Sequence, residues 1–133
     1  MASVCREISL GADPAAVWDA VRDWGALHER LVPGFVTDTK VEGGARVVTF
    51  ASGAVAREVI VTVDDEARRL AYSIVESPLG LEHHHATVEV FAEGAGCRFV
   101  WTADLLPDDR ADTVAMLTDQ GIAAVGRAFA GPA

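Results

Sequence analysis

Apolar residues recur at every second position through most of the region between Thr37 and Leu106. A period of two is typical of β-strands that bury one face. Short clusters of Gly, Ser, Pro and acidic residues interrupt this pattern, which predicts consecutive strands joined by tight turns and therefore an antiparallel sheet. The expected strands are 35–41, 45–51, 55–63, 70–76, 84–92 and 97–105, with one more at Val4–Leu10.

Helical periodicity is confined to the two ends of the chain. Asp13 is a good N-cap and Pro14 suits the first helical position, so we expect a helix over 14–24, followed by a shorter one at about 26–31. After Pro107 a long helix is expected, with Asp108 as its cap and its end near Ala130. Its apolar stripe consists of Ala111, Val114, Leu117, Thr118, Gly121, Ile122, Val125 and Phe129.

The order of these elements predicts an α+β fold. A sheet with one apolar face must be covered, and the long C-terminal helix is the only element large enough to do so. A curved sheet around one helix leaves a gap at its open end, which the short helices would roof and which would form a small-molecule cavity. A length of 133 residues corresponds to one domain, 1–133.

The amino-acid composition limits the classes of binding partner and the cellular location that we expect. The chain has 20 acidic and 11 basic side chains, and a net charge of −9 disfavours nucleic acid and anionic membranes as partners. No apolar run approaches the ~18 residues of a membrane span, and Met1–Leu10 lacks the apolar core of a signal peptide. We therefore expect no membrane insertion and a cytoplasmic protein. Cys5 and Cys97 have no metal or redox spacing, so we expect reduced thiols.

Three segments resemble the START-like (SRPBCC) superfamily, which includes the bacterial polyketide cyclase/dehydrase and lipid-transport proteins. They are ADPAAVWDAVRDWGALHERLVPGF (12–35), GAVAREVIVTVDDEARRLAYSIVES (53–77) and FVWTADLLP (99–107). The resemblance implies the helix-grip fold: a seven-stranded curved antiparallel sheet wrapped around a long C-terminal helix, with two short helices after strand 1. Strand 1 would then pair with the last strand, which places Cys5 and Cys97 at opposite ends and excludes a disulfide between them.

The resemblance also implies which strand faces look into the cavity. Periodicity alone favours Val59, Val61 and Val63 as the inner face and Glu58 as an outer residue, whereas the resemblance turns Glu58 inward. We follow the resemblance, which leaves the three valines outside, where the partner subunit of a homodimer would cover them. The expected ligand-binding positions are Val48, Phe50, Glu58, Ile60, Tyr72, Ile74, Glu76, His84, Ala86, Val88, Trp101, Leu117 and Gly121.

The run His83-His84-His85 lies inside the chain and leads into a strand, so it is not a purification tag. Only His83 and His85 share a strand face, and no further ligand stands at a useful spacing. We therefore expect these two to be solvated edge residues, and we expect no metal and no cofactor. His84 would face the cavity, where it needs a hydrogen-bond partner, and Glu58 and Glu76 are the candidates.

Other side chains have simpler structural interpretations. We expect Trp18 and Trp24 in the core, Arg6 pointing outward, and Asp64-Asp65-Glu66 in a solvated turn.

Three functions are compatible with these patterns. The first is binding or transport of a hydrophobic small molecule, such as a lipid, polyketide or aromatic compound. The second is a polyketide cyclase or dehydratase, in which Glu58, Tyr72 and His84 would be the candidate catalytic acid–base residues. The third is a protein-interaction module that uses the outer valines and the exposed histidines. The chain has no glycine-rich phosphate loop and no nucleophile elbow.

Overall fold

The computed structural model describes residues 1–130 and has the expected order of elements. The strands are β1 (Ala2–Leu10), β2 (Val36–Glu42), β3 (Ala45–Phe50), β4 (Val55–Asp64), β5 (Arg69–Glu76), β6 (His83–Glu93) and β7 (Gly96–Leu106). The helices are α1 (Pro14–Arg22) and α2 (Ala111–Ala128), with short 3₁₀ turns η1 (Trp24–Ala26) and η3 (Asp108–Arg110) and one π-helical turn, η2 (Leu27–Leu31).

The seven strands form one antiparallel sheet in the order β1-β7-β6-β5-β4-β3-β2. Strand β1 returns to pair with β7, so that Cys5 lies opposite Thr102 whereas Cys97 lies opposite Leu10. Cys97 is thus at one end of the pair and Cys5 near its middle, and both are free thiols, so no disulfide joins them, as expected.

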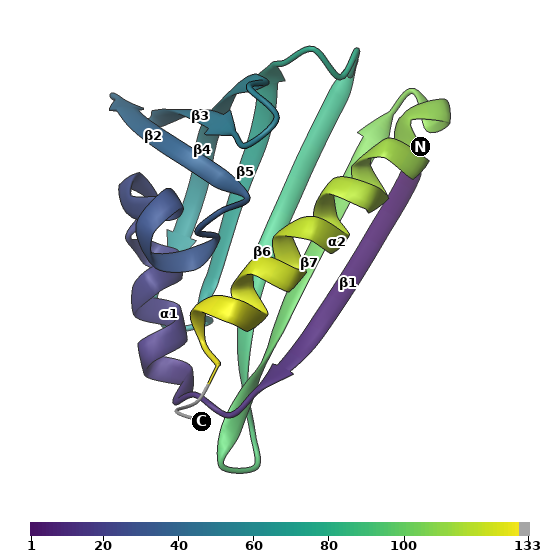
Figure 1. Ribbon diagram of the computed structural model, residues 1–133. Helices are drawn as coiled ribbons and strands as arrows, with labels where there is room; N and C mark the ends of the chain where they lie inside the picture. Colours follow the sequence, from purple (N-terminus) through teal and green to yellow (C-terminus); the bar gives the residue numbers. More distant parts are fainter. Residues whose placement is uncertain (131–133) are drawn as a thin grey trace.

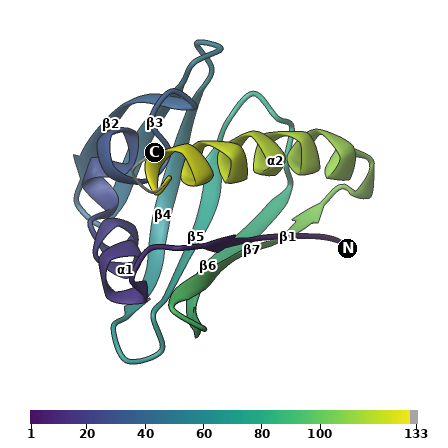
Figure 2. The same ribbon diagram turned by 60° about the horizontal axis from the view of Figure 1, so that its bottom comes forward.

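Helix α2 crosses the concave face of the curved sheet, and α1 with η1 and η2 lies beside it on the same face (Figures 1 and 2). This is the helix-grip architecture. The buried residues of α2 include Val114, Thr118, Gly121 and Val125, members of the expected stripe. The expected cap at Asp108 is wrong, because η3 intervenes: α2 starts only after Arg110, whose side chain makes no capping hydrogen bond.

Helix α1 begins as predicted, with the Asp13 carboxylate accepting a hydrogen bond from the amide of Ala15 at 2.8 Å. It ends at Arg22, two residues earlier than expected, because the backbone leaves the helical region at Asp23. Trp18 is buried in the core as expected, but its indole Nε1 donates to Asp65 at 2.9 Å. The acidic turn is therefore not merely solvated, since Asp65 anchors α1 to the β4–β5 turn.

Strand β4 resolves the conflict over Glu58. Glu58 is 4% exposed and faces the interior, as the resemblance implied. The register with β5 shifts between Ile60 and Thr62, so Val61 is an extra residue that changes the side on which later residues lie. Val59 and Val61 are exposed, but Val63 packs against the core, so the prediction of three outward valines is wrong at Val63.

Two further expectations need correction. Arg6 does not point away from the molecule: it shares a face of β1 with buried Val4 and bonds to Asp119 of α2 at 2.7 Å. His83 and His85 pair with β7 alone, because the β5–β6 pairing ends at Ala86; His83 is exposed as expected, but His85 is half-buried rather than solvated. No helix within residues 1–130 is both long enough and apolar enough to cross a lipid bilayer.

Candidate ligand-binding site

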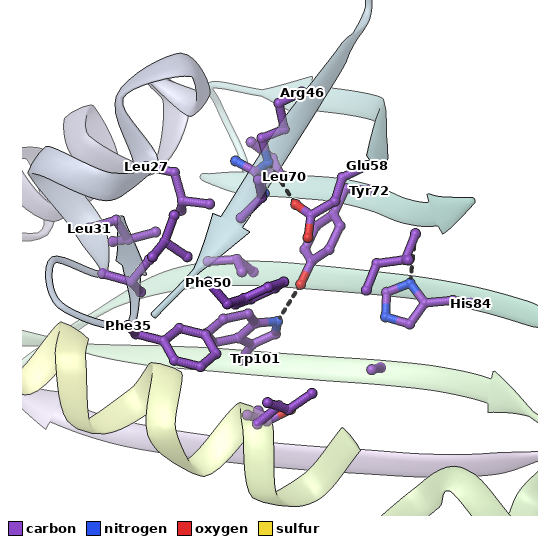
Figure 3. A pocket seen from close by; sticks show the side chains of 18 of the residues that line it. Leu27, Leu31, Phe35, Arg46, Phe50, Glu58, Leu70, Tyr72, His84 and Trp101 are labelled. Carbon is purple, nitrogen blue, oxygen red and sulfur yellow. Dashed lines mark hydrogen bonds and ion pairs between the residues drawn. The ribbon is translucent and has the colours of Figure 1, made fainter. Parts of the chain in front are cut away.

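A cavity of about 70 Å³ lies between the concave face of the sheet and the helices. Leu27, Leu31 and Val32 close it on the side of η2, and Val114, Leu117 and Thr118 close it on the side of α2. Strands β2 to β7 contribute most of the remaining wall (Figure 3), together with Val21 of α1 and the loop residues Phe35 and Leu79. Most of this wall is apolar, and the polar side chains other than Thr118 stand on the strands.

The expected site residues fall into two groups. Val48, Phe50, Glu58, Tyr72, Ile74, His84, Val88, Trp101 and Leu117 line the cavity. Three others, Ile60, Ala86 and Gly121, lie in or against the hydrophobic core but do not line the cavity, and Glu76 is exposed. Glu76 lies outside because Val75 is left unpaired between β4 and β5, which places Glu76 opposite Arg57.

Arg46, which the sequence analysis did not select, forms a buried ion pair with Glu58. Its Nε donates to Glu58 Oε1 at 2.7 Å, and the two side chains are 5% and 6% exposed. Its Nη1 also donates to the backbone carbonyl of Trp24 at 3.2 Å. Strand alternation could have revealed this residue, since Arg46 shares its face of β3 with Val48 and Phe50.

Tyr72 joins this ion pair to Trp101. The Arg46 guanidinium lies over the tyrosine ring, 5.2 Å from its centroid, and the Trp101 indole donates to the Tyr72 hydroxyl at 3.0 Å. Burial, and secondly the charge of Glu58, raises the pKa of the Tyr72 hydroxyl above its usual value. The hydroxyl therefore keeps its proton at neutral pH.

His84 is buried, as expected, but neither Glu58 nor Glu76 is its partner. Its Nδ1 accepts a hydrogen bond from the backbone amide of Ile74 at 3.0 Å (Figure 3). Paired residues of β5 and β6 end at Tyr72 and Ala86, so the imidazole supplies an acceptor just beyond the end of the ladder. Burial, assisted by the neighbouring histidines, lowers the pKa of His84 to about 4, and the ring is neutral at pH 7.

A second pocket, of about 330 Å³, lies next to the first. The β3–β4 loop, the β5–β6 loop and α2 form its walls, with Ala51, Pro78 and Met116 among its lining residues. Four side chains line both pockets: Phe35, Phe50, Leu79 and Leu117. Phe35 and Phe50 meet edge to face, with ring centroids 5.2 Å apart. The first cavity, called the inner cavity below, and the second, called the outer pocket, thus share these four apolar side chains.

Comparison with protein families identifies the chain. Residues 1–129 match the family described as polyketide cyclase / dehydrase and lipid transport. The chain belongs to this family. No curated protein matches it by sequence.

Solved structures share the fold of this chain. XoxI from Bacillus cereus has a TM-score of 0.87 at 19% identity, over 97% of this chain and 96% of its own. A protein from Thermobifida fusca has a TM-score of 0.78 at 26% identity, over 97% and 91%. Norcoclaurine synthase from Thalictrum flavum, in complex with dopamine and hydroxybenzaldehyde, has a TM-score of 0.73 at 21% identity, over 96% and 83%.

The family description covers both catalysis and transport. A general base needs a free lone pair, but the basic nitrogen of His84 is occupied by the Ile74 amide. Glu58 is held by Arg46, and Tyr72 retains its proton. The cavity thus combines the buried Arg46–Glu58 ion pair with two neutral side chains, Tyr72 and His84, in an apolar setting.

Proposed function

We propose that this protein binds a small hydrophobic molecule, whose apolar body extends from the inner cavity past Phe50 and Leu117 into the outer pocket. The observation that carries the proposal is the contiguity of the two pockets, which share four apolar side chains. Concave, largely apolar sites with a few converging polar groups are the usual form of small-molecule sites. Membership of a family described by lipid transport is consistent with this proposal.

The experiment blocks the junction between the pockets. Leu117→Trp places an indole where the two pockets meet, and Ala123→Trp places the same group on an exposed position of α2. Binding of the apolar fluorophore N-phenyl-1-naphthylamine is measured by titration for each variant, after thermal melts establish that both are folded.

We expect Leu117→Trp to weaken fluorophore binding at least tenfold and Ala123→Trp to leave it unchanged. Equal affinity of the wild type and Leu117→Trp would show that the hydrophobic probe binds elsewhere, and would refute the proposal.

A further inference from the structure

The hydrogen bond to Ile74 fixes the tautomer of His84. Because Nδ1 accepts from the Ile74 amide at 3.0 Å, the single proton of the neutral ring is on Nε2. Figure 3 shows this second nitrogen on the side of the ring that faces Tyr72 and Trp101. Within residues 1–130 no acceptor bonds to Nε2, so His84 presents an unused N–H donor to the cavity.

The hydroxyl of Tyr72 is constrained in the same way. An indole N–H can only donate, so the Trp101 bond at 3.0 Å occupies a lone pair of the tyrosine oxygen. The proton of the Tyr72 hydroxyl has no acceptor among the described residues, although the side chain is only 5% exposed. The nearby carboxylate of Glu58 is engaged by Arg46 instead. A buried donor without a partner is destabilising, and a ligand that supplies an acceptor would relieve this.

These two donors stand next to each other on the cavity wall. The rings of Tyr72 and His84 have centroids 5.7 Å apart, and both line the inner cavity. Both are neutral and each offers one proton, whereas the adjacent Glu58 is charged and its Oε1 already accepts from Arg46. The pair is thus complementary to one uncharged oxygen that accepts two hydrogen bonds.

We propose that the ligand carries a carbonyl oxygen at its inner end, bound by Nε2–H of His84 and the hydroxyl of Tyr72. The inference rests on the proposed binding function and adds the chemical class of the ligand. A ketone or aldehyde oxygen has two lone pairs and no proton of its own, so it satisfies both donors without needing an acceptor. A carboxylate fits less well, because the donors are neutral and the carboxylate of Glu58 lies beside Tyr72 (Figure 3).

A pair of ligands with the same shape tests the carbonyl directly. Cyclohexanone and methylenecyclohexane differ only in the exchange of C=O for C=CH₂. Their affinities are measured by NMR titration, following the Trp101 indole N–H and the Ile74 amide. Two hydrogen bonds to neutral donors predict that the wild type binds the ketone about tenfold more tightly than the hydrocarbon.

The variants test whether these two donors cause the preference. Tyr72→Phe and His84→Phe each keep an aromatic ring and remove one donor, and His83→Gln alters an exposed histidine outside the cavity. The readout is the ratio of the two affinities, because loss of packing would weaken both probes alike. We expect the ratio to fall several-fold in both phenylalanine variants and to stay at the wild-type value in His83→Gln.

Each other outcome overturns a specific statement. Equal binding of ketone and hydrocarbon by the wild type refutes the carbonyl proposal and leaves hydrophobic binding standing. A ketone preference that survives in both phenylalanine variants refutes the assignment of His84 and Tyr72. Failure of both probes to bind refutes the carbonyl proposal together with the proposed function.

Discussion

Replacing Glu58 with glutamine leaves the Arg46 guanidinium buried without a counter-charge. We expect Glu58→Gln to lower the free energy of unfolding by about 3–5 kcal/mol, as is typical when one partner of a buried ion pair is removed. The two side chains are 5% and 6% exposed, so bulk water has little access to the guanidinium once the carboxylate is removed.

The magnitude follows from the geometry of the pair. At 2.7 Å and an effective dielectric of about 20, the attraction is about 6 kcal/mol. Taking each ion out of water costs several kcal/mol, so the intact pair contributes little net stability. We therefore expect the double variant Arg46→Met/Glu58→Leu to be no less stable than Glu58→Gln, because it removes both charges and fills the space with apolar groups.

Urea unfolding followed by circular dichroism measures these free energies. The matched control is Glu42→Gln, which breaks an exposed ion pair with Arg57 between β2 and β4, the two strands on either side of β3, and should cost less than about 1 kcal/mol. If Glu58→Gln costs no more than Glu42→Gln, the buried charge of Arg46 is solvated in solution and the reasoning fails.

Two further predictions concern helix packing and pH. A Cβ at Gly121 would lie 2.5 Å from the Trp101 ring, so Gly121→Ala should cost about 1–3 kcal/mol in urea unfolding and disturb the indole N–H resonance. Gly126→Ala, where the nearest atom is the end of a flexible side chain, should be neutral or gain up to about 1 kcal/mol of helix propensity. His84 has a pKa of about 4 when folded and about 6.5 when unfolded, so stability is greatest above pH 6.5 and falls by up to about 3 kcal/mol toward pH 4. The free energy of unfolding is measured at pH 7 and at pH 4.5. Its decrease between the two pH values should be smaller in His84→Phe than in the wild type, and the same as in the wild type in His83→Gln. Equal decreases in all three proteins would exclude His84 as the cause.

The architecture was predictable because its signals are local. Alternation between Thr37 and Leu106, the cap at Asp13 and the stripe on the C-terminal segment each act over a few residues, and together they admit one covered antiparallel sheet. The predictions that are wrong depend on interactions between residues that are far apart in the sequence. The extra residue at Val61 is a feature of pairing between strands, and periodicity within one strand cannot reveal it.

The candidate site was only partly predictable for a related reason. Glu58, Tyr72 and His84 were selected and all line the cavity, but their partners were not foreseen. Arg46 was passed over although it lies on the correct face, because a cation in an apolar wall is rare without a counter-ion nearby. The partner of His84 is a backbone amide, and a backbone amide leaves no mark in a side-chain pattern.

The bulge at Val61 divides β4 into two halves that differ in whether even-numbered or odd-numbered residues face inward. Before it, even-numbered positions such as Glu58 look inward; beyond it, the odd-numbered Val63 does. A deletion of Val61 would bring Thr62 directly after Ile60 and would leave Glu58 and Val63 on the inner face of a regular strand. The bulge therefore absorbs one extra residue locally, and the residues before and after it keep their β5 partners and their common inner face.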